Sequence, residues 1–361
     1  MKLNKNKGIT LIALVITIVI LLILAGISIS ALTQTGLFGK AKKAEQKVKE
    51  AEQNQTTTLG SYEKNINKYI AEELTNDNVD TVLSKTENKV LKDSKGNIFT
   101  VPAGFKVTKD ATNVADGIVI EDATDTATKG SQFVWVPVGA ITKSDGTTVE
   151  IKLDRYTFAN DEKGTPTAQI NKVIDEYFQE LETSDNGNTV AKSITDFKNS
   201  VATNGGYYIG RYEARKSSSG TITEVKTDTV WVSIIQPDAA TKAQNMYNSN
   251  KFTSDLMNSY AWDTATLFIQ NCGTNSKYSR QISLNTSFLS TGTTDDKQCN
   301  IYDMASNVRE WTTETSSDSS APCVNRGGNY DGNSNVYTSF RDKRSTSTSY
   351  WFIGFRSILY F

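Results

Sequence analysis

The residues best suited to chemistry lie in one stretch near the C-terminus, between the R-G-G of residues 326–328 and the G-F-R of residues 354–356. The 25 residues between these motifs include five Ser, three Thr, three Asn, three Tyr and one Trp. Rings supply contact area and small polar groups supply adaptable hydrogen bonds, a mixture typical of surfaces that bind other molecules. The composition predicts a ligand-binding surface. A Ser/Thr/Asn-rich surface loop without a ligand is the alternative.

The predicted binding residues are four aromatic side chains and five polar neighbours. The aromatic residues should stand close together on the surface, and the polar residues should line the same patch. The set is Tyr330, Tyr337, Tyr350 and Trp351 with Asn329, Asp331, Asn333, Ser334 and Asn335.

The composition excludes several function classes. Histidine is absent, which removes the commonest metal ligand and the usual general base at neutral pH. The formal net charge of the chain is -1, so its electrostatics do not favour a nucleic-acid partner. Only three cysteines occur, and none follows Cys323.

The N-terminus has the pattern of a membrane anchor. Three lysines precede Gly8, and no charged residue occurs from Ile9 to Gly39. The apolar core from Ile9 to Ile29 would span about 31 Å as a helix, enough to cross a bilayer. A secretory signal has a shorter apolar core, followed by a small-residue cleavage site. We therefore predict a single-pass anchor over residues 9–31, with the chain after Leu32 outside the cell.

The remainder of the chain predicts a stalk and one globular domain. Residues 32–74 are amphipathic and highly charged, as in a stalk helix, and residues 75–361 form the domain. Alternating patterns predict strands at 88–104 (two, around a turn at 94–97), 117–121 and 132–138. Helical spacing predicts helices at 171–182, 193–201, from about 240 to 247, and 254–270.

The segment K-G-I-T-L-I-A-L-V-I-T, residues 7–17, resembles the leader and first helix of type IV prepilins. The resemblance implies a leader over residues 1–8 that a prepilin peptidase removes between Gly8 and Ile9. Such pilins usually carry Glu at the fifth mature position, where this chain has Ala13. Plain membrane anchoring or a place at a filament tip, beside pilin-like subunits, therefore fits better than the filament body. An uncleaved anchor helix is the alternative.

Several motifs occur in a fixed order along the C-terminal half: N-G-G-Y-Y-I-G-R-Y-E-A (204–214), V-W-V-S-I-I-Q-P-D-A-A (230–240), N-I-Y-D-M-A-S-N-V-R-E-W-T (300–312), R-G-G and G-F-R. Together they resemble the sulfatase-modifying family, the formylglycine-generating-enzyme-like version of the C-type lectin fold. The resemblance implies an α+β domain in which irregular mixed sheets and two helices support a loop-rich C-terminal face, with residues 300–311 in its core.

The resemblance also bears on cofactors. The formylglycine-generating members need two copper-binding cysteines between R-G-G and G-F-R, and related iron enzymes use histidines; this chain has neither, so we expect no catalysis and no catalytic cofactor. The family pattern implies a structural calcium bound by Glu310 with the carbonyls of Ser306 and Val308. Pairing of Glu310 with Arg326 or Arg356 is the alternative.

For the cysteines, the resembled fold implies a Cys299–Cys323 disulfide with Cys272 left as a thiol. Three buried, unpaired cysteines are the alternative. An exported domain would sit where disulfides persist.

The same fold serves as the scaffold of variable proteins of diversity-generating retroelements, whose C-terminal surface residues vary while the scaffold is kept. By this resemblance residues 326–356 form the variable region, in which Arg326, Arg341 and Arg356 belong to the constant scaffold. We therefore expect a membrane-tethered or pilus-associated display protein that binds an unknown protein or glycan ligand and no nucleic acid. A formylglycine-generating-enzyme-like oxidoreductase and a purely structural minor pilin are the alternatives.

Overall fold

The computed structural model describes residues 70–158, 177–184, 186–216, 222–225, 227–330 and 336–361, together with the helical residues 43–44, 47–48, 51, 55, 58–60, 62 and 66. The chain divides into two compact units, Met1–Thr58 and Leu59–Phe361. Within this described part of the chain, no helix has the length and apolarity needed to cross a bilayer. The predicted leader (1–8) and anchor (9–31) lie outside the described residues.

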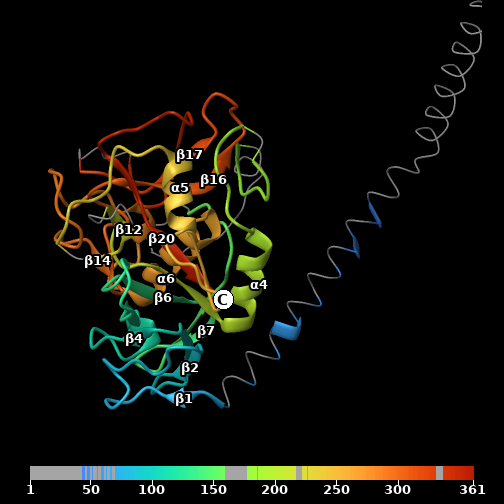
Figure 1. Ribbon diagram of the computed structural model, residues 1–361, viewed down its shortest axis with the longest axis vertical. Coiled ribbons are helices and arrows are strands. Elements are labelled where there is room, and N and C mark those ends of the chain that lie inside the picture. The colour runs from blue at the N-terminus through green and yellow to red at the C-terminus, as the bar shows by residue number, and fades with distance from the viewer. Residues whose placement is uncertain are drawn as a thin grey trace, which may run out of the picture. The chain divides into compact units, whose positions relative to one another are not determined.

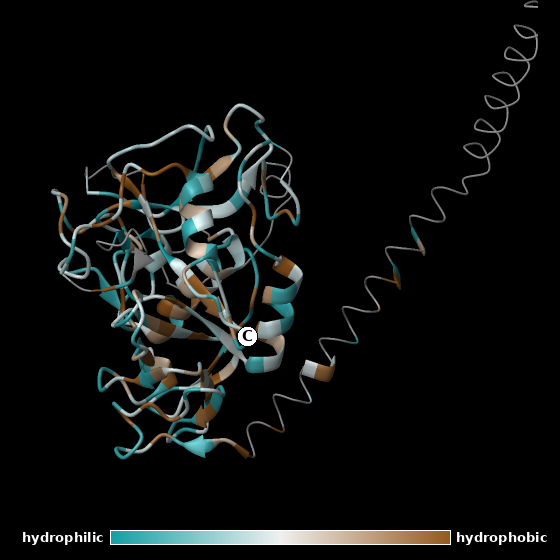
Figure 2. Ribbon diagram, in the orientation of Figure 1, coloured by the Kyte–Doolittle hydropathy of each residue, from teal (hydrophilic) through white to brown (hydrophobic). Residues whose placement is uncertain are grey.

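A six-stranded antiparallel sheet forms the centre of the second unit, in the order β13-β20-β10-β6-β5-β4 (Figure 1). The strands are β4 Phe105–Val107, β5 Val119–Asp122, β6 Gln132–Pro137, β10 Gly206–Gly210, β13 Thr253–Leu256 and β20 Ser357–Tyr360. All five residues of β10 are buried because the sheet is covered on both faces. Figure 2 shows apolar segments concentrated in this interior and polar ones in the surrounding loops.

Three helices pack around this sheet, and each begins with a recognisable start signal. In α4, Ile194–Asn204, the hydroxyl of Ser193 accepts a hydrogen bond from the Asp196 amide. In α6, Ser259–Cys272, the side chain of Asn258 caps the helix in the same way. The third helix, α5 (Gln236–Gln244), has proline in its first turn, where no backbone donor is needed.

A second, mixed sheet carries the C-terminal motifs. Its strands are β16 Arg309–Ser316, β17 Cys323–Arg326, β18 Arg341–Arg344 and β19 Ile353–Phe355, with β9 Phe178–Gln179 pairing to the end of β16. β16 is buried along its whole length, pairs antiparallel with β17 and parallel with β19. Only Arg356 separates β19 from β20, so the last strands of the chain join the two sheets. The predicted α+β class is thus supported.

Shorter pairs complete the domain. They are β1 Glu72–Glu73 with β2 Lys89–Lys92 and β3 Ile98–Val101, β7 Gly139–Thr142 with β8 Thr148–Ile151, β11 Arg215–Lys216 with β12 Ile222–Thr223, and β14 Lys297–Gln298 with β15 Ile301–Tyr302. Figure 1 shows β1, β2 and β4 at one end of the domain and β16 and β17 at the other.

Most predicted elements are confirmed, and three boundaries are wrong. The helix predicted over 171–182 is contradicted at its described end, because residues 178–179 are strand β9. The helix predicted from Ser254 begins at Ser259, because residues 253–256 pair with β20 as β13. The stalk helix ends at Ile70 rather than 74, since the chain then enters β1.

Candidate binding site

A buried ionic network lies beneath the loops of the C-terminal face. Arg326 of β17 and Arg341 of β18 each contact Asp263 of α6 at 2.5 Å, and both also contact Glu314 of β16, at 3.1 and 2.9 Å. Arg155 adds a third guanidinium, 2.8 Å from Glu314. Burial alone would raise the pKa of Glu314, but the three guanidiniums lower it to about 2. We call Arg155, Asp263, Glu314, Arg326 and Arg341 the ionic network.

Arg356 is the second buried arginine centre, and it joins both sheets. It binds both carboxylate oxygens of Glu310 on β16, with Nε 2.6 Å from Oε2. It also donates to the carbonyls of Gly210 and Tyr302, at 3.0 and 2.9 Å. Arg326 and Arg356 are fully buried and Arg341 is nearly so. The prediction that these three arginines are scaffold is therefore confirmed in their placement.

The same contacts bear on the calcium ion that the family resemblance implies. Glu310 is paired with Arg356, as the alternative to calcium predicted. A cation at Glu310 would therefore have to share both carboxylate oxygens with the Arg356 guanidinium. The described residues contain no group of three acidic or cysteine side chains placed to hold a metal. The residues present therefore do not fit calcium bound by Glu310 with the carbonyls of Ser306 and Val308.

A turn at Asn307 positions the loops of the face. Asn307 adopts a left-handed backbone conformation (φ 61°) that is uncommon outside glycine. Glu213 stabilises it by accepting hydrogen bonds from the Asn307 side chain at 2.6 Å and from the Val308 amide at 3.1 Å. Asn307 in turn accepts from the amides of Leu289 and Tyr330, both at 3.0 Å. The turn thus fixes two loops at once.

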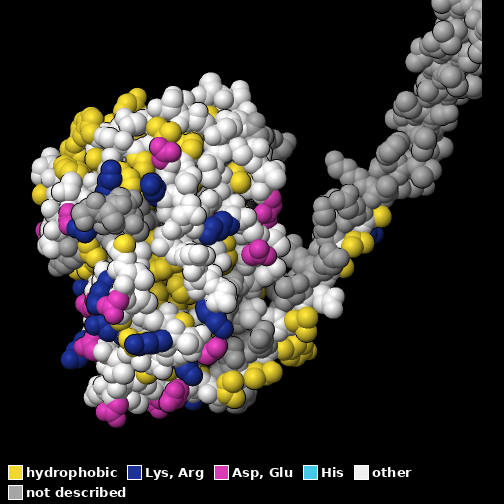
Figure 3. Space-filling view, viewed as in Figure 1, with side chains coloured by type: hydrophobic (Ala, Val, Ile, Leu, Met, Phe, Trp, Pro, Cys, Tyr) yellow, Lys and Arg dark blue, Asp and Glu magenta, His cyan; other side chains and the backbone are white. Residues whose placement is uncertain are grey.

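Five aromatic rings form a connected series on these loops, which we call the aromatic row. The ring centroids lie 5.9 Å apart for Phe288 and Tyr330, 5.3 Å for Tyr330 and Trp351, 5.3 Å for Trp351 and Phe352, and 5.1 Å for Phe352 and Tyr350. Trp351 is 55% exposed, Tyr350 43% and Phe288 37%. Figure 3 shows hydrophobic side chains gathered at the upper left of the domain, where Figure 1 draws loops of the C-terminal third.

Backbone hydrogen bonds fix the C-terminal part of the row. The Tyr350 carbonyl accepts from the Ser233 amide and the Phe352 carbonyl accepts from the Arg309 amide, each at 3.0 Å. The Arg309 guanidinium lies 5.6 Å from the Phe352 ring and 2.6 Å from Asp342. Large rings on a fixed backbone lose little conformational entropy on binding, which favours affinity.

The structure brings three of the four predicted aromatic residues together. Tyr330, Tyr350 and Trp351 belong to the row, although Tyr330 is half-buried. Tyr337 does not contact the row; its ring lies against Phe340 at 5.9 Å and under the Arg280 guanidinium at 3.7 Å. There it lines a separate cavity of about 290 Å³ with Phe158, among others.

The prediction for Asn329 is wrong, because its side chain is buried (2% exposed). The cause is the preceding R-G-G motif. A Cβ at Gly328 would lie 1.9 Å from the Ala305 carbonyl oxygen, so this part of the chain runs directly against neighbouring backbone and carries Asn329 inward. The other predicted polar residues, Asp331, Asn333, Ser334 and Asn335, lie outside the described residues.

Two members of the row escaped the prediction. Phe352 lies inside the selected interval, and Phe288 lies in the segment Q-I-S-L-N-T-S-F-L of residues 281–289. Apolar side chains alternate with Ser, Asn and Thr there, and Ile282, Leu284 and Phe288 are all exposed. That alternation in an otherwise polar stretch was the available signal.

The predicted Cys299–Cys323 disulfide is not formed: all three cysteines are thiols in the structure, which was the alternative, and Cys299 and Cys323 lie in different sheets. Cys323 opens β17, and its Sγ lies 3.7 Å from Oε1 of Gln236. Cys299 lies instead in the turn between β14 and β15, a hairpin outside that sheet. The resemblance implied that Cys299 and Cys323 lie on neighbouring strands, but the β14–β15 hairpin and β17 belong to different sheets.

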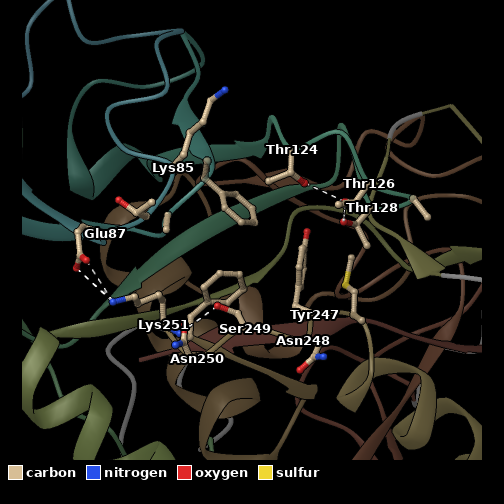
Figure 4. A pocket seen from close by; sticks show the side chains of 16 residues that line it. Lys85, Glu87, Thr124, Thr126, Thr128, Tyr247, Asn248, Ser249, Asn250 and Lys251 are labelled. Atoms are coloured by element: carbon tan, nitrogen blue, oxygen red, sulfur yellow. Dashed lines mark hydrogen bonds and ion pairs between the residues drawn. The ribbon is translucent and has the colours of Figure 1, made fainter.

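A cavity of about 950 Å³ lies away from the predicted residues, between the loop at 246–252 and the loops around residues 85–87 and 124–128 (Figure 4). Phe105, Tyr247 and Phe252 pack against one another in its lining. Figure 4 shows Lys251 paired with Glu87 on one side, at 3.3 Å, and three threonines on the other. None of the predicted binding residues lines this cavity.

Comparisons with known proteins agree with the motifs of the C-terminal part. The chain matches no curated protein. The solved structure of PvdO from Pseudomonas aeruginosa is 14% identical, with 72% of this chain and 99% of that one covered and a TM-score of 0.35. Treponema denticola variable protein 1 is also 14% identical, with 64% and 97% covered and a TM-score of 0.28. Residues 237–360 match the family model described as the sulfatase-modifying factor enzyme 1-like domain. The formylglycine-generating-enzyme-like fold predicted from the motifs is therefore supported over this part of the chain.

Proposed function

We propose that this protein displays a ligand-binding domain at the cell surface and binds a protein or glycan through the aromatic row, without catalysis. The observation that carries the proposal is the row itself. Exposed aromatic side chains that touch one another are uncommon on a surface without a partner, because each leaves apolar area in water. Such rings commonly supply most of the binding energy at an interface.

The support beneath the row favours binding rather than a mobile loop. The turn at Asn307 fixes the loops that carry Phe288 and Tyr330, and the Arg309 and Ser233 amides fix the segment of Tyr350 and Phe352. The aromatic side chains can therefore differ between relatives without changing the buried contacts that define the fold. A variable surface on a constant scaffold, as in the retroelement-diversified proteins that the sequence resembles, needs this separation.

Absence of catalysis is part of the proposal and rests on composition. The interval from Arg326 to Arg356 has no cysteine for copper, and the whole chain has no histidine for iron. Ser, Thr and Asn side chains near the rings suit hydrogen bonding to a ligand, not activation of a nucleophile.

The binding test compares alanine variants of the full chain. Replacing Tyr330, Tyr350 and Trp351 together should abolish binding to whole cells or to the spots of a glycan and protein array that the unaltered protein labels. Each ring should contribute about 2 kcal/mol, or about a 30-fold loss of affinity. The melting temperature should change little. The matched control is Tyr62→Ala, an aromatic residue that is 64% exposed outside the row.

Two results would contradict the proposal. One is unchanged binding by the triple variant, which would place the ligand site elsewhere. The other is a triple variant that unfolds as readily as one lacking Arg326, which would make the rings part of the core.

The tether is proposed from the sequence. The mature chain should begin at Ile9, remain in the membrane fraction, and expose its C-terminal domain to protease added outside the cell. N-terminal sequencing of the native protein checks the first point. A chain that still begins at Met1 would reduce the proposal to an uncleaved anchor, and a protease-protected domain would contradict surface display.

A further inference from the structure

The tip of the β14–β15 hairpin is fastened to the end of helix α6. Oε1 of Gln298 accepts hydrogen bonds from the amide and the hydroxyl of Thr274, at 2.9 and 3.0 Å. The Sγ of the next residue, Cys299, lies beside Gly273. A Cβ placed on Gly273 would be 3.4 Å from that sulfur, an ordinary van der Waals distance. Gly273 directly follows Cys272, the last residue of α6. Two of the three cysteines are therefore neighbours.

The hairpin tip is held in a constrained conformation. Cys299 and Asn300 both have positive φ, 46° and 62°, which matches a two-residue turn that glycine usually forms. The Asn300 side chain donates to the Gly117 carbonyl at 2.9 Å, and a Cβ at Gly117 would collide with the Cys299 carbonyl. Such backbone strain persists only where surrounding contacts fix it. The position of the Cys299 side chain is thus determined by the fold.

We propose that Cys272 and Cys299 are the pair that forms a disulfide in this protein. Each thiol loses one proton and one electron as the Sγ–Sγ bond forms, and a disulfide donor, glutathione disulfide or an oxidoreductase of the secretory route, is reduced to two thiols. Cys323 stays a thiol because it lies in the other sheet beside Gln236. Burial raises the pKa of Cys272 to about 12, so exchange should be faster during folding than in the folded domain.

The bridge would act on the binding surface. The 26 residues from Gly273 to Gln298 lie between the two cysteines, and they include Phe288 of the aromatic row. Closing this loop removes conformational freedom from the unfolded chain and limits opening of the loop in the folded one. The effect on binding rests on the proposed function. The bridge itself does not, because peptide mapping detects it without any ligand.

Trypsin separates the three cysteines cleanly. Cleavage after lysine and arginine places Cys272 in peptide 252–277, Cys299 in peptide 298–309 and Cys323 in peptide 310–326. The full chain is extracted from cells in acid, alkylated with N-ethylmaleimide in detergent and digested without reductant. A second sample is refolded from denaturant in a glutathione redox buffer. We expect a linked 252–277/298–309 species in both samples and an alkylated 310–326 peptide.

Thermal melts with and without dithiothreitol complete the test. The reductant should lower the melting temperature of the unaltered chain and of the control Cys323→Ser by about 5 °C. It should have no effect on Cys272→Ser or Cys299→Ser, whatever stability those variants retain. Alkylation of all three cysteines in both samples, or a linked peptide that contains Cys323, overturns the proposal.

Discussion

The ionic network and the aromatic row both take residues from the stretch 326–353 but use their side chains in opposite ways. The network removes three guanidiniums and two carboxylates from water and pairs them with one another. In the row, the large rings lie partly in water, and hydrogen bonds to neighbouring segments fix the backbone that carries them. Removing one buried charge takes an ion pair from each of its buried partners, whereas removing one ring exposes little that was hidden. The first region should therefore tolerate almost no substitution, and the second should tolerate many.

The strongest test of this contrast is Arg326→Ala. The change removes one of the three buried guanidiniums, which leaves Asp263 with Arg341 and Glu314 with Arg155 and Arg341; breaking a buried pair from one side costs about 3–5 kcal/mol. Urea unfolding should show that loss or an unfolded chain. The matched control is Arg344→Ala, because Arg344 pairs with Asp342 in a half-exposed position, where such pairs contribute about 1 kcal/mol or less. Equal losses from the two variants would remove the distinction.

The pH dependence of folding sharpens the comparison, because it reports on carboxyl groups buried in the scaffold. Burial raises the pKa of Glu224 to about 8, against hydrogen bonding from Ser357 that lowers it. The folded state then binds this proton more tightly than the unfolded state does. The stabilisation is complete below the unfolded pKa, near 4.5, and is lost as the pH rises through about 8.

Glu224→Gln should therefore remove most of the fall in stability that this carboxyl causes between pH 5 and 8, about 3–4 kcal/mol. Unfolding curves at each pH measure it. Glu314 provides the opposite sign, since its pKa is lowered to about 2: its contribution is present above its ordinary pKa and is lost in acid. An unchanged slope in the Gln variant would show that the Glu224 carboxyl is not the group that titrates.

Tyr337 gives the smallest effect and tests where the row ends. Its ring packs against Phe340 and Arg280 and lies off the row. Tyr337→Ala should lower stability by about 1 kcal/mol and leave ligand affinity within about twofold, since most substitutions outside a contact surface do not change binding. A loss of affinity like that of Trp351→Ala would extend the binding surface to the cavity beside Phe158.

The sequence was sufficient for the elements whose signals are local. The turn at 94–97, the helix at 193–201 and the strand at 132–138 depend on neighbours in the chain, and all three are confirmed. The burial of Arg326, Arg341 and Arg356 followed from the family resemblance.

The errors arose where distant segments decide the outcome. Residues 253–256 have a helix-compatible pattern but pair with β20, which lies about 100 residues later. Asn329 is polar in a polar stretch, yet the close passage of Gly328 along Ala305 carries it inward. The cysteine pairing failed for the same reason, because it needed the hairpin of β14 and β15 to be placed in space. No periodicity in the chain contains that information.

The position of β19 and β20 has a consequence for synthesis. These strands, within residues 353–360, come after every other element of the two sheets in the chain, and they supply both the parallel partner of β16 and the strand between β10 and β13. Neither sheet can close until residues 353–360 have been made and have left the ribosome. A stop codon or a shifted reading frame anywhere in residues 329–353 would remove both strands. Only chains translated in frame through residues 329–353 can fold. Folding itself therefore removes products with a frameshift or a stop codon in that stretch.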